Sequence, residues 1–185
     1  MKCIAHRGYS RKYKDNTIEA IREAIHREYD GVEIDVQLCE TGELVLFHDV
    51  YTEGKFISEM CLDQVKELGI ITLQQVYEEI PQIRRTLLIL DIKGADLGVV
   101  KALETFYEKE STENVLFCSF NRKIVYRLPK EFKIGSTFET TFHKSEYPLI
   151  TMGLNAVVLH WTSLDHQFIT HCKNEDIRVY TYTHK

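Results

Sequence analysis

The chain has 185 residues, 44% of them hydrophobic and 28% charged, and its formal net charge is -5. Length and composition are those of one ordinary globular domain, which argues against a disordered, fibrous or multidomain protein. The acidic balance, without a dense run of lysine and arginine, argues against a nucleic-acid partner, and the lack of 18 consecutive apolar residues argues against a transmembrane segment.

The first residues turn polar after four positions and lack the apolar core of a signal peptide, so we expect a cytoplasmic protein. Residues 2–6 predict a buried strand. Asn16 is a candidate N-cap for the helix that follows, which the spacing of its isoleucines indicates, and Asp30-Gly31 ends that helix. Residues 32–38 predict the next strand, with 43–47 as its hairpin partner across a Thr41-Gly42 turn.

Beyond this hairpin, strands and helices continue to alternate. Further strands are expected over residues 87–92, 115–120, 133–138, 156–161 and 178–182, and helices over 62–68, 73–80, 95–109, 123–128, 146–152 and 165–174. Such alternation indicates a parallel sheet with crossover helices. About seven repeats fit either a TIM-type barrel that stops short of eight strands or an open doubly wound sheet, and the pattern alone does not choose between them.

Reactive side chains gather where the predicted strands end. In parallel α/β folds the carboxyl ends of the strands carry the active site, so these groups are expected at one edge of the sheet. They come from four segments: His6 and Arg7, Glu33 and Asp35, His48 and Asp49, and Asp91 and Lys93.

The acidic residues predict a metal site. Glu33 and Asp35 are two residues apart, so on a strand both point to the same face. Together with Asp91 they would repel one another strongly without a cation. Carboxylate oxygens suit a hard divalent cation, Mg²⁺ or Ca²⁺.

The basic residues indicate an anionic substrate. Arg7 and Lys93 place positive charge beside the expected ion, which suits a phosphate group. His6 and His48 titrate near neutral pH and are candidates for proton transfer. Each signal alone also fits a structural role, such as an ion pair or a solvated lysine. The joint pattern favours a functional site, because charge inside strands is costly unless it is paired or used.

These residues carry a family resemblance. His6-Arg7-Gly8, Asp15-Asn16-Thr17, Glu33-Ile34-Asp35-Val36-Gln37-Leu38, His48-Asp49 and Asp91-Ile92-Lys93 occur in this order. In this order they resemble the glycerophosphodiester phosphodiesterase family, and Ser119-Phe120-Asn121 also fits its pattern. The resemblance extends from residue 2 to about 182 and is most specific in the first 50 residues.

The resemblance implies a TIM-type barrel that cleaves glycerophosphodiesters to sn-glycerol 3-phosphate and an alcohol with the help of a metal. It implies that Glu33, Asp35 and Asp91 bind the metal, that His6 and His48 form the acid–base pair, and that Arg7 and Lys93 hold the phosphate. It does not decide which histidine is the acid, or whether water or a glycerol hydroxyl is the nucleophile.

The sequence also departs from the family pattern. The family usually has Glu at the position of Asp91, and the aspartate side chain is shorter than that of glutamate by one methylene group. We interpret residues 1–185 as a single barrel domain whose insertion, at about 49–86, is shorter than usual, which predicts a more open pocket. The family also usually continues beyond the strand at 178–182, so we expect a barrel shortened at its C-terminal end, with seven parallel strands, a hairpin strand and no eighth βα unit.

Exposed strand edges favour aggregation, so a homodimer that covers the open edge is one expected solution. Trp161 and Tyr182 are candidates for an apolar pocket wall, and core packing explains Trp161 equally well. Two other functions stay open beside hydrolysis of glycerophosphodiesters: a lipid phosphodiesterase of the lysophospholipase D type, and a binding or regulatory module that kept the barrel but turns over weakly.

Overall fold

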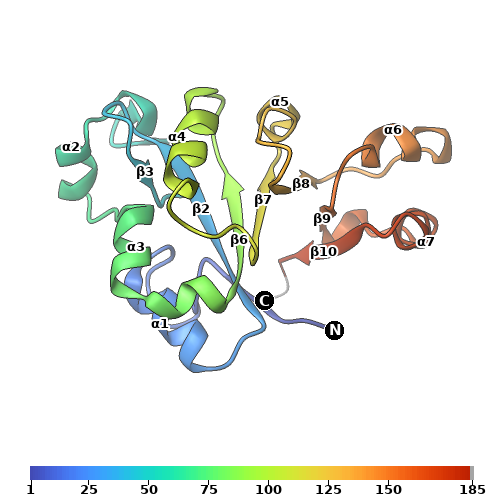
Figure 1. Ribbon diagram of the computed structural model, residues 1–185, viewed down its shortest axis with the longest axis horizontal. Helices are drawn as coiled ribbons and strands as arrows, with labels where there is room; N and C mark the ends of the chain where they lie inside the picture. Colours follow the sequence, from blue (N-terminus) through green and yellow to red (C-terminus); the bar gives the residue numbers. More distant parts are fainter. Residues whose placement is uncertain (184–185) are drawn as a thin grey trace.

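The computed structural model describes residues 1–183 and contains one curled parallel sheet (Figure 1). Seven parallel strands follow one another in the order β1-β2-β6-β7-β8-β9-β10, and the short strand β3 pairs antiparallel with β2. These strands are β1 (Ile4–His6), β2 (Gly31–Leu38), β3 (Leu44–Val45), β6 (Leu87–Ile92), β7 (Val115–Ser119), β8 (Lys133–Phe138), β9 (Ala156–His160) and β10 (Arg178–Tyr182).

The helices lie on the outer side of this sheet, as in a TIM-type barrel (Figure 1). They are α1 (Ile18–His26), α2 (Leu62–Glu67), α3 (Leu73–Glu79), α4 (Gly98–Tyr107), α5 (Arg122–Val125), α6 (Tyr147–Thr151) and α7 (His166–Asn174). Short 3₁₀ helices are η1 (Ile57–Glu59), η2 (Pro81–Arg85), η3 (Lys144–Glu146) and η4 (Trp161–Ser163). The expected TIM-type architecture is confirmed as a curled half-barrel of seven parallel strands, and within residues 1–183 β1 and β10 are its edges.

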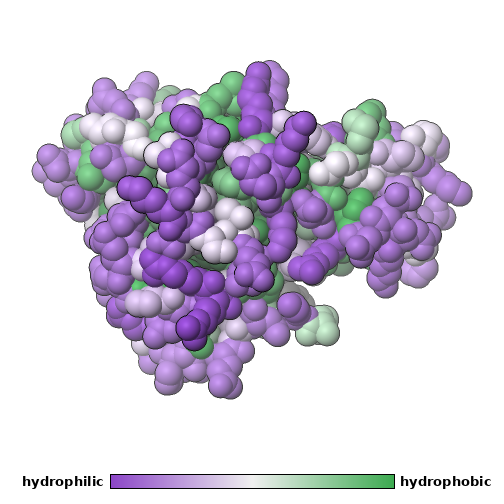
Figure 2. All heavy atoms as spheres, viewed as in Figure 1, coloured by the Kyte–Doolittle hydropathy of each residue, from purple (hydrophilic) through white to green (hydrophobic). Residues whose placement is uncertain are grey.

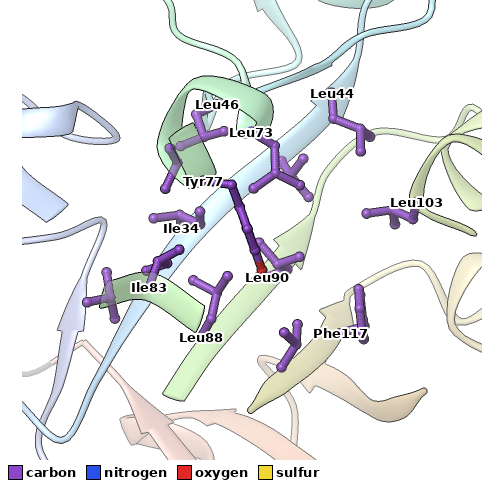
Figure 3. Packing of buried hydrophobic residues seen from close by; sticks show 14 of the residues in the cluster. Ile34, Leu44, Leu46, Leu73, Tyr77, Ile83, Leu88, Leu90, Leu103 and Phe117 are labelled. Atoms are coloured by element: carbon purple, nitrogen blue, oxygen red, sulfur yellow. The ribbon is translucent and has the colours of Figure 1, made fainter. Parts of the chain in front are cut away.

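Alternate residues of each strand face the helices and build the main core. Ile34 and Leu90 are fully buried there, between the sheet and Leu73 and Tyr77 of α3 (Figure 3). Removing such side chains from water drives folding at roughly 25 cal/mol per Å² of apolar surface. Successive side chains of a strand point to opposite faces of the sheet. The residues that alternate with this core set, which include Glu33, Asp35 and Asp91, therefore point to the inside of the half-barrel.

The inside of the half-barrel has a small apolar floor below the charged groups. Ile89, Leu116, Cys118 and Ala156 form it. Gly135 lies against this floor, because a Cβ there would meet Cys118 Sγ at 2.9 Å. The four residues of the floor come from β6, β7 and β9.

A second core packs β8, β9 and β10 against α5, α6 and α7, with Phe168 buried at its centre. The molecular face seen in Figure 2 is mostly hydrophilic, with smaller hydrophobic areas between the polar side chains. No helix among the described residues has the length and hydrophobicity needed to span a bilayer.

Several elements begin or end one to three residues away from their expected bounds, and three differences from the sequence expectation are structurally informative. Thr17 caps α1, not Asn16, and its side chain accepts the backbone N–H of Ala20. The helix expected from residue 95 begins at Gly98, after a turn held by Asp96. The segment after His48 also contains a two-stranded hairpin, β4 (Tyr51–Thr52) and β5 (Lys55–Phe56), which the sequence pattern did not predict.

Candidate active site at the carboxyl ends of the strands

Strand register brings the three predicted acidic residues together. On neighbouring parallel strands Asp35 pairs directly with Asp91, and Glu33 pairs with His6. One oxygen from each of Glu33, Asp35 and Asp91 lies within 4.8 Å of the others. Their side chains are only 12%, 1% and 13% exposed, respectively. The cluster is therefore a compact, largely buried group of oxygen donors.

Two basic side chains share this cluster. Lys93 Nζ donates to Asp91 Oδ2 at 2.6 Å and lies 3.1 Å from Asp35 Oδ1. Arg7 Nε lies 3.2 Å from Asp35 Oδ2, while its Nη1 donates to Asp15 at 3.1 Å. Arg7 and Lys93 thus flank the carboxylates from two different strands.

Burial shifts the pKa of the groups in this cluster. Burial, followed by the charges of Asp35 and Asp91, raises the pKa of Glu33 well above its usual range. Burial also raises the pKa of Asp91, although Lys93 opposes this effect. Burial by itself would lower the pKa of Lys93, but the two aspartates outweigh it and leave that pKa above its ordinary value.

The donor set fits a hard divalent cation. Asp91 Oδ1 is buried and accepts no hydrogen bond within residues 1–183. Three buried carboxylates this close together repel one another when all of them are ionised. The raised pKa of Glu33 indicates that the neighbouring basic side chains do not fully offset this repulsion. An ion coordinated by oxygen would satisfy both conditions, and all-oxygen sites are typical of Mg²⁺ and Ca²⁺.

His6 ends β1 beside the carboxylates. Its Nε2 lies 3.8 Å from Glu33 Oε2, and the side chain is 33% exposed. Burial, and then the positive charge of Arg7, lowers the pKa of His6 to about 4. The imidazole is therefore neutral at physiological pH and able to accept a proton.

His48 lines the same cavity as His6, from the segment between β3 and β4. Its Nδ1 is hydrogen-bonded to Asp49 Oδ1 at 2.7 Å. Gln37, which is buried at the end of β2, donates through Nε2 to the carbonyl oxygens of Phe47 and Asp49 at 2.7 and 2.9 Å. These two bonds fix the backbone on both sides of His48.

The loop after β1 holds its residues in unusual backbone conformations. Arg7, Gly8 and Asn16 have positive φ angles of 58°, 78° and 57°. The loop is closed by hydrogen bonds from Asn16 N to Arg7 O at 3.1 Å and from Tyr9 N to Ala20 O at 2.8 Å. Left-handed non-glycine residues are uncommon and gather at functional sites, because surrounding contacts must hold them there.

Asn16 itself reaches into the acidic cluster. Its Nδ2 donates to Asp35 Oδ2 at 2.8 Å, and its Oδ1 accepts the backbone N–H of Asp35 at 3.0 Å. Asn16 is 4% exposed. It therefore fixes the orientation of the most buried carboxylate of the site.

All seven predicted catalytic, phosphate-binding and metal-binding positions lie in this region, and most of them line one cavity of about 270 Å³. Of the two predicted wall residues, Tyr182 lines the same cavity. Trp161 lies further out, 57% exposed, with its ring 5.8 Å from that of His160. The cavity residues from the predicted set are His6, Arg7, Glu33, His48, Asp91, Lys93 and Tyr182.

Comparison with known proteins agrees with this geometry. Residues 6–185 match the profile of the glycerophosphoryl diester phosphodiesterase family. The chain belongs to this family. It is accordingly an enzyme of phosphodiester hydrolysis.

Individual members of the glycerophosphodiester phosphodiesterase family resemble the chain over most of its length. The glycerophosphodiester phosphodiesterase of Caldanaerobacter subterraneus subsp. tengcongensis is 26% identical, over 97% of this chain and 84% of the relative. Glycerophosphodiester phosphodiesterase 1 of Mus musculus is 29% identical over 69% of this chain, which spans only 45% of that protein. An Oleispira antarctica phosphodiesterase, solved with the product sn-glycerol-3-phosphate, superposes with a TM-score of 0.87 at 23% identity, over 100% of this chain and 85% of that one.

Two residues of this phosphodiesterase site were missed by sequence reasoning. Asn16 was interpreted as a helix cap because Asn, Ser, Thr and Asp all favour that position. Gln37 follows Glu33 and Asp35 at the same two-residue spacing. This spacing predicts that the side chain of Gln37 points to the same face of the strand as theirs. Nothing in the local sequence of Asn16 points to a partner 19 residues away.

Proposed function

We propose that this phosphodiesterase hydrolyses glycerophosphodiesters to sn-glycerol 3-phosphate and an alcohol, in a reaction that depends on a divalent cation. The main support is the convergence of three carboxylates, two histidines and two basic side chains at one cavity of a chain from this family. The product complex of the Oleispira relative is consistent with the same reaction.

The metal would be held by Glu33, Asp35 and Asp91, whose oxygens lie close enough together to share one ion. When bound, it would supply positive charge that stabilises the phosphoryl group in the transition state. Mg²⁺ and Ca²⁺ are the proposed ions, because the ligands are all carboxylate oxygens.

Arg7 and Lys93 would bind the phosphate. Their cationic groups lie beside the carboxylates, within 3.2 Å of Asp35 in both cases. A guanidinium offers several N–H donors to phosphate oxygens, whereas an ammonium acts as a compact charge. Together they would orient the diester with its phosphorus between the two histidines.

The histidines would divide the proton transfers. We infer that His6 is the base, because it ends β1 beside Glu33 and its lowered pKa keeps its imidazole neutral and able to take a proton from the attacking water or glycerol hydroxyl. His48 would be the acid, because it lines the same cavity and the 2.7 Å hydrogen bond between its Nδ1 and Asp49 Oδ1 fixes the orientation of its ring. In this arrangement His48 donates a proton to the leaving alcohol.

The proposal is tested by assaying glycerophosphocholine hydrolysis with Mg²⁺, with Ca²⁺ and with EDTA. Removing either histidine, in His6→Ala or His48→Ala, should lower kcat by at least about 100-fold, which is typical for loss of a general acid or base. His26→Ala, at an exposed position on α1, is the matched control. Activity that persists in EDTA would refute the metal dependence, and no turnover of any glycerophosphodiester with either ion would refute the function.

A further inference from the structure

The cavity has a second wall, opposite the acidic cluster, that the proposed reaction does not use. It is built where β8, β9 and β10 end. Glu139 follows β8, His160 ends β9 and Tyr182 ends β10, and all three line the cavity. Thr137, two residues before Glu139, also lines it, as expected for the inward face of a strand.

Glu139 is an acidic group without a basic partner. Its Oε1 accepts a hydrogen bond from the Tyr182 hydroxyl at 3.2 Å. In the part of the chain that the structure describes, no basic side chain forms an ion pair with Glu139. Burial, with a contribution from Glu139, raises the pKa of Tyr182, so this phenol remains a donor to the carboxylate. The wall therefore offers an anchored negative charge to whatever enters the cavity.

Aromatic rings lie around Tyr182, the hydrogen-bond partner of this carboxylate. The Tyr182 ring lies 5.4 Å from the His160 ring and 6.2 Å from the Phe120 ring. Trp161 extends the row outwards beyond His160. Lys93 Nζ already lies 5.5 Å from the centre of the Phe120 ring, which marks the boundary between the phosphate side and this wall. Aromatic faces and a carboxylate both attract cations.

The two basic side chains and Glu139 occupy different parts of the cavity. Arg7 and Lys93 lie beside the acidic cluster, where a phosphate would be bound together with the ion, and Glu139 follows β8 on the second wall. A substrate with an anionic phosphate and a cationic group a few atoms away matches this layout. An alcohol that carries negative charge would be repelled by Glu139, so the same carboxylate also acts against wrong substrates.

We propose that Glu139 and Tyr182, with Trp161 at the rim, form a subsite for a cationic amino alcohol, so that the enzyme prefers glycerophosphodiesters of choline or ethanolamine. This inference rests on the proposed function and assigns the substrate class of the same site. Tyr182 positions the carboxylate, and the ring of Tyr182 covers the cation. The ring of Trp161 shields it from bulk water.

The decisive measurement is the ratio of kcat/KM for glycerophosphocholine to kcat/KM for glycerophosphoglycerol, whose alcohol is neutral. Glu139→Gln keeps the size of the side chain and removes its charge, so the ratio should fall about tenfold. Tyr182→Phe and Trp161→Ala should lower it less, by about threefold. Glu131→Gln, at an exposed residue before β8, is the matched control and should leave the ratio unchanged.

A second measurement reads out binding to the subsite. Choline should inhibit the enzyme competitively and better than 3,3-dimethylbutanol, its uncharged analogue of the same shape. Glu139→Gln should remove this difference. Equal inhibition of the unaltered enzyme by the two compounds would overturn the subsite.

The possible failures are distinguishable. If the unaltered enzyme hydrolyses neither diester, the proposed function fails. If it hydrolyses both and Glu139→Gln leaves the ratio unchanged, only the cationic subsite fails. If Glu139→Gln slows both diesters equally, Glu139 contacts the glycerol that they share, and the preference proposed here is overturned.

Discussion

Asp35 is the residue on which most contacts of the site converge. Asn16 binds both its backbone and its side chain, and Arg7 and Lys93 approach its two carboxylate oxygens. A carboxylate that is only 1% exposed is stable in this position because each neighbour offsets part of the cost of its burial. The orientation of Asp35 therefore depends on Asn16 as much as on its own strand.

Replacing Asn16 should weaken the site without removing any group that reacts. Asn16→Gly suits the positive φ of 57° and deletes only the amide, which leaves the backbone N–H of Asp35 without its partner. We expect a loss of about 1–3 kcal/mol in the free energy of unfolding and a higher concentration of metal ion for half-maximal activity. Urea unfolding and metal titration check both; unchanged metal dependence would contradict the positioning role.

At the scale of elements, the loop from β1 to α1 is held by a close backbone approach. A Cβ at Gly8 would lie 2.6 Å from the backbone carbon of Ala20 and 2.8 Å from its Cβ. Gly8 also has a φ of 78°, which favours glycine. The position of α1 and the conformation of Arg7 are thus set by the same contact.

Gly8→Ala should therefore be damaging despite adding one methyl group. The added carbon would push α1 away from the loop, and the backbone strain alone costs about 1 kcal/mol or more. We expect a lower urea midpoint together with a raised KM, because Arg7 would shift. Gly69→Ala is the control, since its φ of 69° imposes similar strain but its added Cβ would meet no atom within 4 Å. Equal effects of the two substitutions would contradict the packing argument.

The N-terminus of α7 predicts a pH effect on stability. Asp165 accepts hydrogen bonds from the Tyr147 hydroxyl and from the backbone N–H groups of Gln167 and Phe168, and these bonds lower its pKa, Tyr147 most strongly. A carboxyl with a lowered pKa stabilises the fold above its ordinary pKa, near 4, and loses this effect as the pH falls through its folded value.

Asp165→Asn should accordingly lower the unfolding temperature at pH 7, and the difference from the unaltered protein should shrink towards pH 3. Thermal unfolding followed by circular dichroism at both pH values measures this. Asp176→Asn, at an exposed residue just after the same helix, should show no such trend. A difference for Asp165→Asn that is constant with pH would mean that the charge of the cap is unimportant.

At the scale of the whole molecule, the acidic cluster lies where two neighbouring strands inside the sheet, β2 and β6, end. Asp35 and Asp91 come from β2 and β6, which also supply the main core. An ion bound by both strands would resist their separation. Metal binding at these carboxylates would therefore couple stability to function.

Divalent cations should raise the thermal midpoint of the protein. A ligand at 100 times its Kd that binds only the folded state adds about 2.7 kcal/mol to the free energy of unfolding. Scanning fluorimetry with Mg²⁺ or Ca²⁺, compared with EDTA, measures the shift, and Asp91→Asn should abolish most of it. Asp63→Asn, at an exposed residue of α2, should retain it. If neither ion moved the midpoint, the acidic cluster would not be a metal site.

Most of this architecture could be predicted, because strands and helices are indicated by the pattern of apolar and polar residues close together in the sequence. The strands at 87–92, 133–138 and 178–182 were predicted with their observed bounds, since apolar runs and their flanking residues define them locally. The same alternation predicted that Glu33 and Asp35 point to one face of their strand, and in the structure this is the face that carries the acidic cluster. Pairing across long separations was out of reach: nothing near Asn16 indicates Asp35, and nothing near Glu139 indicates Tyr182.

The alternation of inner and outer residues also restricts how such a protein can evolve. Inserting or deleting one residue within β6 would turn Asp91 towards the helices and bring its apolar neighbours to the cavity. Length changes are tolerable only in the connections, such as the segment from β3 to β6 that carries the β4–β5 hairpin. New substrate preferences should therefore arise by lengthening loops or exchanging single inward residues, while the lengths of the strands remain fixed.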